Sequence, residues 1–319
     1  MMSLLLSLAL LVFGFALLVC GADVFVRGAS ALAKRLGVSS LLIGLTIVAL
    51  GTSLPELAIS VVASVLGNNE IAVGNVIGSN LVNLLAILGL CAILSPLPVC
   101  RKKVQLDFWA SIVGAFLVVL SIALSHGIPR IGGSILLLGF LSILASQIRR
   151  GVTDVNNTSK EELCATTLLS PCKIALFLVT GVAAITIGAK ITISGAVGIA
   201  RYCHLSERLI GLTIVAIGTS LPELVTSVVA ALKNENDLAV GNVIGSNVYN
   251  IFLILGLSSA LSPINFEATQ ISELLVDSAL LLFASLFFFI PIWKEHVGRL
   301  AGSIMLLTYI LYSVWLFSA

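Results

Sequence analysis

LIGLTIVALGTSLPELAISVVASVLGNNEIAVGNVIGSNLVN, at residues 42–83, occurs a second time in the chain with few changes. Residues 209–250 read LIGLTIVAIGTSLPELVTSVVAALKNENDLAVGNVIGSNVYN, and at a constant offset of 167 positions 30 of the 42 aligned residues are identical. Each copy places one glutamate, several hydroxyl groups and several asparagines within an apolar run. Matching polar groups in two repeated hydrophobic segments are typical of a transporter with a site at the repeat interface.

The composition points to a membrane protein. Of the 319 residues 59% are hydrophobic and 10% are charged, and the mean hydropathy is +1.16. A soluble domain carries far more charge, so the chain is expected to cross the membrane several times. Because no basic residue precedes the first apolar stretch, residues 3–33 are interpreted as a retained first helix and not as a signal peptide.

Ten apolar stretches are long enough to cross about 30 Å of hydrocarbon. They lie at 3–33, 38–66, 71–95, 105–125, 129–148, 172–200, 206–232, 238–261, 271–292 and 297–317. The predicted fold is therefore an all-α polytopic membrane protein with ten transmembrane helices in two five-helix repeats. The first repeat spans 1–150 and the second 172–319, with the polar segment 151–171 as a linker. Helices 2, 3, 7 and 8 carry the repeated motifs and are expected at the core, with broken helices among them.

Basic residues predict the orientation. With the N-terminus outside, the cytoplasmic side receives Lys34, Arg35, Arg101, Lys102, Lys103, Arg149, Arg150, Lys160, Lys173, Lys233, Lys294 and Arg299, and the outside receives Arg130, Arg201 and Arg208. Twelve basic residues on one side against three on the other favour a cytoplasmic linker at 149–171 and both termini outside, or in the periplasm, of a protein in the cell (inner) membrane. Five spans per half make the repeats inverted. Asp23 and Arg27, four residues apart in the first helix, are expected to pair.

The sequence GTSLPE, at 51–56 and 218–223, predicts a break in each helix that contains it. Pro55 has no amide hydrogen, and its ring collides with the carbonyl group of Gly51; Pro222 does the same to Gly218. Freed carbonyl groups at membrane depth need protein or a polar cavity around them. Oxygen atoms of this kind suit a hard cation.

Glu56 and Glu223 follow each proline directly. An ionised carboxylate at the centre of a bilayer costs several kcal/mol, and neither GTSLPE nor AVGNVIGSN contains a lysine or arginine to pair with it. Two such groups brought together by a pseudo-two-fold axis would compensate one divalent ion, and oxygen ligands favour Ca²⁺ or Mg²⁺.

The second motif, AVGNVIGSN, is followed three residues later by another asparagine. Ser79 and Asn83 share one helix face, as do Ser246 and Asn250, and their oxygens can coordinate Na⁺ or Ca²⁺. Two interpretations remain open for the other asparagines of the motif, cation binding and hydrogen bonding between helices. These are Asn75, Asn80, Asn242 and Asn247.

The duplicated GTSLPE and GNVIGSN motifs resemble the alpha-repeats of the calcium/cation antiporter superfamily, in particular sodium/calcium exchangers and their prokaryotic relatives. The resemblance implies alternating access with four cation sites at mid-membrane, no catalytic residues and no cofactor, with Ca²⁺ and Na⁺ as cargo. For the calcium site it implies Glu56 and Glu223 with Thr52 and Thr219, for the sodium sites Ser53, Ser220, Ser79 and Ser246 with the carbonyl groups of Ala49 and Ala216, and for the central position Asn83 and Asn250.

The predicted function is electrogenic extrusion of Ca²⁺ in exchange for Na⁺. Many relatives carry Asp at the position of Asn250, as potassium-dependent exchangers do, so Asn argues against a potassium requirement. The alternatives are an antiporter of the same superfamily that uses H⁺ or carries another divalent ion, an intramembrane enzyme, and a receptor or scaffold. The lipid bilayer is the only expected partner beside the ions; neither nucleic acid nor an obligatory protein partner is inferred.

Overall fold

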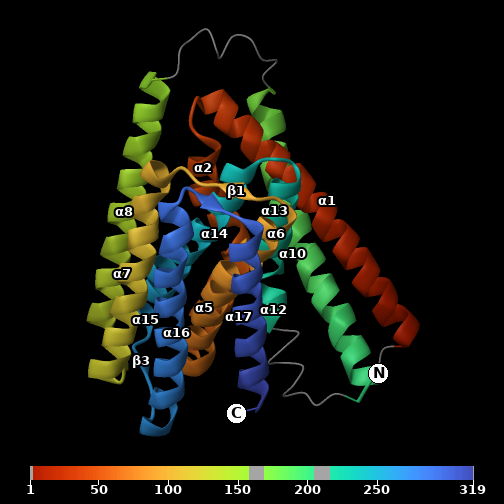
Figure 1. Cartoon of the computed structure of the whole chain (residues 1–319). Helices are drawn as coiled ribbons and strands as arrows, with labels where there is room; N and C mark the ends of the chain where they lie inside the picture. The colour runs from red at the N-terminus through yellow and green to blue at the C-terminus, as the bar shows by residue number, and fades with distance from the viewer. Residues whose placement is uncertain (1–2, 158–168, 205–215, 319) are drawn as a thin grey trace.

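The computed structural model describes residues 3–157, 169–204 and 216–318. Almost all of them are helical, and the helices stand side by side as a bundle (Figure 1). The first half contains α1 (Leu4–Leu36), α2 (Ser40–Ile43), η1 (Gly44–Val48), α3 (Ala49–Thr52), α4 (Leu54–Val65), α5 (Asn69–Leu81), η2 (Val82–Ile87), α6 (Leu88–Leu94), β1 (Leu97–Pro98), α7 (Arg101–Ser125), β2 (Gly127–Ile128) and α8 (Arg130–Asn157).

The second half repeats this order of elements. It contains α10 (Pro171–Tyr202), α12 (Ala216–Thr219), α13 (Leu221–Leu232), α14 (Asn236–Val248), η4 (Tyr249–Leu255), α15 (Gly256–Leu261), β3 (Ile264–Asn265), α16 (Ala268–Trp293), β4 (His296–Val297) and α17 (Arg299–Ser318). The π-helical segments η2 and η4 occupy equivalent places in the two central helices.

The number of membrane-spanning helices agrees with the sequence as far as the described residues reach. Eight helices are long and apolar enough to cross a bilayer, and the broken helix from Ser40 to Val65 makes a ninth. The predicted helix 206–232 is described only from Ala216, so its first part lies outside the described residues. So do residues 209–215 of the second repeat and two residues of the charge count, Lys160 and Arg208.

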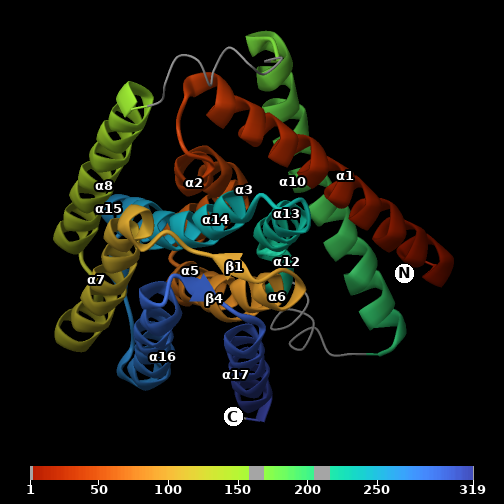
Figure 2. The same ribbon diagram turned by 45° about the horizontal axis from the view of Figure 1, so that its top comes forward.

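Helices α1 and α10 form a long pair beside the rest of the bundle (Figure 2). Glycines let their backbones touch: a Cβ atom on Gly14 would lie 2.5 Å from the amide nitrogen of Thr192, and one on Gly188 would lie 2.6 Å from that of Leu18. Gly14 and Gly21 of α1 lie 167 positions before Gly181 and Gly188 of α10. The pair is therefore built from equivalent surfaces of the two halves.

Two short antiparallel ladders relate the halves in the same way. In the first, β1 pairs with β4, with Leu97 opposite Val297; in the second, β2 pairs with β3, with Ile128 opposite Ile264. Strands β1 and β3 are 167 positions apart, so each ladder joins one strand from each half. Figure 1 places β1 and β3 toward opposite ends of the bundle, as inverted repeats require.

The central helices are the two that carry AVGNVIGSN. The helix α14–η4–α15 is the most buried candidate span, and α5–η2–α6 comes next. Helix α14 packs on η1 of the other half. A Cβ atom on Gly241 would lie 2.6 Å from the carbonyl oxygen of Leu41, so glycine allows the predicted close approach to the broken helix.

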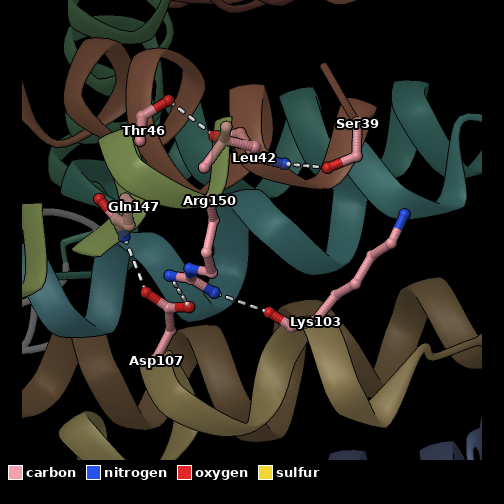
Figure 3. Close-up of polar contacts among 7 residues, drawn as sticks. All are labelled: Ser39, Leu42, Thr46, Lys103, Asp107, Gln147 and Arg150. Atoms are coloured by element: carbon pink, nitrogen blue, oxygen red, sulfur yellow. Dashed lines mark hydrogen bonds and ion pairs between the residues drawn. The ribbon is translucent and has the colours of Figure 1, made fainter. Parts of the chain in front are cut away.

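Charged residues away from the GTSLPE and AVGNVIGSN motifs pair near one end of the bundle. Arg27 pairs with Asp23 at 2.9 Å, as the sequence predicted, and Lys233 also pairs with Asp23. Fully buried Asp107 on α7 accepts hydrogen bonds from Gln147 and Arg150 of α8 (Figure 3). Helix α8 continues to Asn157, beyond the predicted end of the span at 148, and Arg150 on this extension turns inward to the carboxylate.

Candidate functional site

The first GTSLPE motif breaks its helix as predicted. The segments Ser40–Thr52 and Leu54–Val65 are bent by 50° at Ser53, and Pro55 stands in the first turn of α4. Glu56, in the same turn, is only 1% exposed. A carboxylate in the first turn of a helix faces the positive end of the helix dipole, which favours its charge.

The second motif has the same construction. Ser220 separates α12 from α13, Pro222 stands in the first turn of α13, and Glu223 follows it with 1% exposure. Both glutamates therefore point into protein and away from lipid. The two breaks come from opposite halves of the chain and lie against the same central helices.

Hydrogen bonds across the repeats join the two breaks. The hydroxyl of Ser53 donates to Oε1 of Glu223 at 3.0 Å, and the hydroxyl of Ser220 lies 3.2 Å from that of Ser79. Oγ1 of Thr52 lies 3.1 Å from Oδ1 of Asn242. Residues of GTSLPE in one half thus contact residues of both motifs in the other half.

One pair of asparagines supports the glutamate segments. Asn75 donates to the hydroxyl of Ser60 at 2.9 Å and to the carbonyl oxygen of Glu56 at 3.4 Å. Asn242 makes the equivalent bonds, to Ser227 at 2.9 Å and to the carbonyl oxygen of Glu223 at 3.4 Å. The sequence left two interpretations open for these residues, and the structure gives both a hydrogen-bonding role between helices.

A second set of asparagines crosses between the repeats. Nδ2 of Asn83 donates to Oδ1 of Asn247 at 3.0 Å, and Nδ2 of Asn250 donates to Oδ1 of Asn80 at 2.9 Å. Asn80 and Asn247 each also donate to the other's backbone carbonyl, at 3.4 and 3.5 Å. All four side chains are buried.

Several oxygen atoms of this region are buried without a hydrogen-bond donor among the described residues. They are Oε1 and Oε2 of Glu56, Oε2 of Glu223, Oδ1 of Asn83, Oδ1 of Asn250 and the hydroxyl oxygen of Ser246. Buried acceptors without donors are costly unless something positive binds them. Among the described residues no three His, Cys, Asp or Glu side chains lie together so that they could hold a metal ion; the acceptors gathered here are two carboxylates with hydroxyl and amide oxygens. A donor set of this kind suits a hard cation.

Comparison with known proteins gives the family. The model of the sodium/calcium exchanger protein family matches residues 6–149 and 173–318. The chain is 33% identical to the sodium/calcium exchanger MaX1 of Methanosarcina acetivorans over 302 residues, covering 83% of this chain and 85% of the relative. It is 35% identical to the putative antiporter CaxA of Alkalimonas amylolytica over 272 residues, covering 83% and 84%.

A solved structure has the same fold. The sodium-calcium exchanger NCX_Mj, soaked with Na⁺ and Ca²⁺, superposes with a TM-score of 0.81 at 33% sequence identity, covering 96% of this chain and 97% of that one. The chain belongs to the sodium/calcium exchanger protein family. The resemblance drawn from the two motifs is confirmed, and so is the fold of two helical, repeat-like halves.

Membership of this family makes the chain a multi-pass membrane protein of a family of transporters rather than of catalytic enzymes. The relatives support a cation/Ca²⁺ antiporter as its class. Relatives of this kind are also named as membrane proteins, for example inner membrane protein YrbG of Escherichia coli, which is 36% identical over 261 residues covering 79% of this chain and 78% of the relative.

The remaining candidate ligands differ between the halves. The carbonyl oxygen of Ala49 accepts the amide of Ser53 at 3.0 Å and lies 3.3 Å from the hydroxyl of Thr52. Ala216 begins α12, and the amide of Ser220 bonds to Ile217. Thr219 is buried beside this break. A carbonyl oxygen has two lone pairs, and at Ala49 the amide of Ser53 and the hydroxyl of Thr52 both approach it.

Proposed function

We propose that the chain exchanges Na⁺ for Ca²⁺ across the membrane by alternating access. The main support is that two carboxylates, one from each inverted half, lie buried in a region rich in oxygen acceptors that lack donors. A Ca²⁺ ion bound there would balance both charges. No enzyme mechanism is needed to account for this arrangement of oxygens.

The twelve candidate ligands keep the roles that the family resemblance gave them. Glu56, Glu223, Thr52 and Thr219 would bind Ca²⁺; Ser53, Ser220, Ser79, Ser246 and the carbonyl groups of Ala49 and Ala216 would bind Na⁺; Asn83 and Asn250 would complete the central position. Transport at this site needs no resident cofactor, because the ions are the cargo.

The charge of the site accounts for coupling. With both glutamates ionised, bound Ca²⁺ makes the site neutral, and three Na⁺ leave about +1, whereas the empty site carries about −2 and resists transfer through hydrocarbon. The helices would then change conformation when loaded and stall when empty. One net charge would move per cycle, equivalent to roughly 2.3 kcal/mol per 100 mV, so a negative interior drives Ca²⁺ out.

The proposed orientation follows the basic residues. The protein would lie in the cell membrane, with both termini outside and the segment 149–171 in the cytoplasm. The domain division is proposed on the same grounds, with two inverted repeats at 1–150 and 172–319.

The test is ⁴⁵Ca²⁺ flux in proteoliposomes, with gradients of Na⁺, K⁺ and H⁺ imposed separately. We expect flux with the Na⁺ gradient, and its loss in Glu56→Gln and in Glu223→Gln. Glu70→Gln is the matched control, because Glu70 is exposed at the start of α5 and outside this region. Ca²⁺ flux driven by an H⁺ gradient in sodium-free buffer would show that H⁺, and not Na⁺, is the coupling ion. Unchanged flux in either site variant would refute the assignment of Glu56 and Glu223 as ligands.

A further inference from the structure

The four asparagines that cross between the repeats have an amide orientation fixed from the backbone. A backbone carbonyl oxygen can only accept, so Asn247 must present its NH₂ group to the carbonyl of Asn80. Oδ1 of Asn247 then lies on the other side of that amide and can only accept as well. It receives Nδ2 of Asn83 at 3.0 Å.

The orientation of Asn247 in turn fixes the orientation of its hydrogen-bond partner, Asn83. Because the NH₂ group of Asn83 donates to Asn247, Oδ1 of Asn83 points away from Asn247. This oxygen is buried without a donor among the residues described. The same sequence of contacts runs from the carbonyl of Asn247 through Asn80 to Asn250, whose Oδ1 is equally without a described donor. Reversing either outer amide would place two acceptor oxygens face to face.

We infer that Asn80 and Asn247 are positioning residues, which orient the amides of Asn250 and Asn83 so that oxygen, and not NH₂, is offered to a cation. Each acts on the ligand of the opposite repeat. The inference rests on the proposed function, since it takes Asn83 and Asn250 as cation ligands. It also gives a physical role to two asparagines for which the sequence alone left open cation binding and hydrogen bonding between helices.

The orientation matters because an amide is nearly symmetric in shape. Without a partner, its NH₂ group can turn into the site, where it would repel a cation and supply no ligand. A leucine at position 80 is close to asparagine in shape but cannot accept a bond from Asn250. Asn80→Leu should therefore weaken cation binding through Asn250.

The experiment is a double-mutant cycle on the purified full-length chain in detergent. Binding of ⁴⁵Ca²⁺ alone, and of Na⁺ alone by thermal shift, is measured for Asn80→Leu, Asn250→Ala and the double variant. We expect each single change to weaken binding by about tenfold, the equivalent of one hydrogen bond. The double variant should bind no more weakly than Asn250→Ala, because Asn80 has no further ligand to orient.

Two results would overturn the positioning role: binding of both ions by Asn80→Leu at the affinity of the unmodified chain, or losses that multiply in the double variant, as a general packing defect would give. If Asn80→Leu does not fold, the equivalent double-mutant cycle on the other pair, Asn247→Leu with Asn83→Ala, tests the same role. An unmodified chain that binds neither ion would instead reject the proposed function, and the positioning role with it.

Discussion

Ser53 and Glu223 are joined by a hydrogen bond of 3.0 Å between opposite repeats, and the equivalent pair in the other direction, Ser220 and Glu56, is not. Ser220 lies against Ser79 instead, and both carboxylate oxygens of Glu56 lack a donor among the described residues. Two nearly identical sequences therefore hold their glutamates in different environments. In a pseudo-symmetric transporter, such a difference makes the two halves of the site energetically unequal.

This asymmetry predicts unequal effects of two matched substitutions. Ser53→Ala removes a hydrogen bond to a carboxylate, whereas Ser220→Ala removes one between two hydroxyl groups, and bonds to charged groups are about twice as strong. Without ions, Ser53→Ala should destabilise the chain by about 1–2 kcal/mol and Ser220→Ala by less. Thermal unfolding in detergent without Na⁺ or Ca²⁺ measures the difference.

Saturating Ca²⁺ is the internal control. A bound cation would compensate the charge of Glu223 directly. The difference in destabilisation between Ser53→Ala and Ser220→Ala should therefore be smaller when Ca²⁺ is present. Equal destabilisation of both variants without ions would contradict the asymmetry.

Replacing Asn250 by aspartate should make stability depend on pH. An ionised aspartate cannot donate to Oδ1 of Asn80, whereas a protonated one can. Folded Asn250→Asp therefore binds a proton that the unfolded chain has already released, so its stability falls as pH rises through the physiological range. The unmodified chain has no titratable group at position 250, so its stability should depend less on pH over the same range.

The measurement is the midpoint of thermal unfolding between pH 5 and pH 8, without ions, for both chains. Asn250→Ser, which also lacks the amide but does not titrate, serves as the control. A parallel pH response in Asn250→Asp and Asn250→Ser would show that the aspartate is not held against Asn80.

The sequence was sufficient to predict two repeat-like helical halves, the membrane-spanning helices found in the described part of the chain, and the helix break. Periodicity and the 167-residue offset require equivalent helices, and the ring of Pro55 forces the bend that the structure places at Ser53. The sequence alone could not predict which hydrogen-bond partner each polar side chain has. Ser53 and Ser220 occupy identical motifs, so only the packed structure distinguishes a bond to Glu223 from one to Ser79.

Two further features escaped prediction for a similar reason. Ser60 and Ser227 are identical in the two copies but lie away from GTSLPE, and their role as partners of Asn75 and Asn242 depends on how two helices meet. Their identity in both copies was the available signal. Asp107 and Arg150 lie 43 positions apart outside the repeats, so no local pattern connects them.

The pair of Asp107 and Arg150 gives the last prediction, on stability. Asp107 is fully buried, and Arg150 donates to it at 2.6 Å and to the carbonyl oxygen of Lys103 at 2.8 Å (Figure 3). Removing one partner of a buried ion pair leaves an uncompensated charge and costs about 3–5 kcal/mol, whereas replacing both partners costs much less. Arg150→Gln should therefore unfold at a lower temperature than the unmodified chain. The double variant Asp107→Asn with Arg150→Gln should recover much of that loss, because Gln147 can still bond to an amide at position 107. Arg149→Gln, on an exposed neighbour, controls for the loss of a positive charge at this end of α8. Thermal unfolding of the four chains decides the point: a double variant no more stable than Arg150→Gln would mean that the two side chains do not act as a pair.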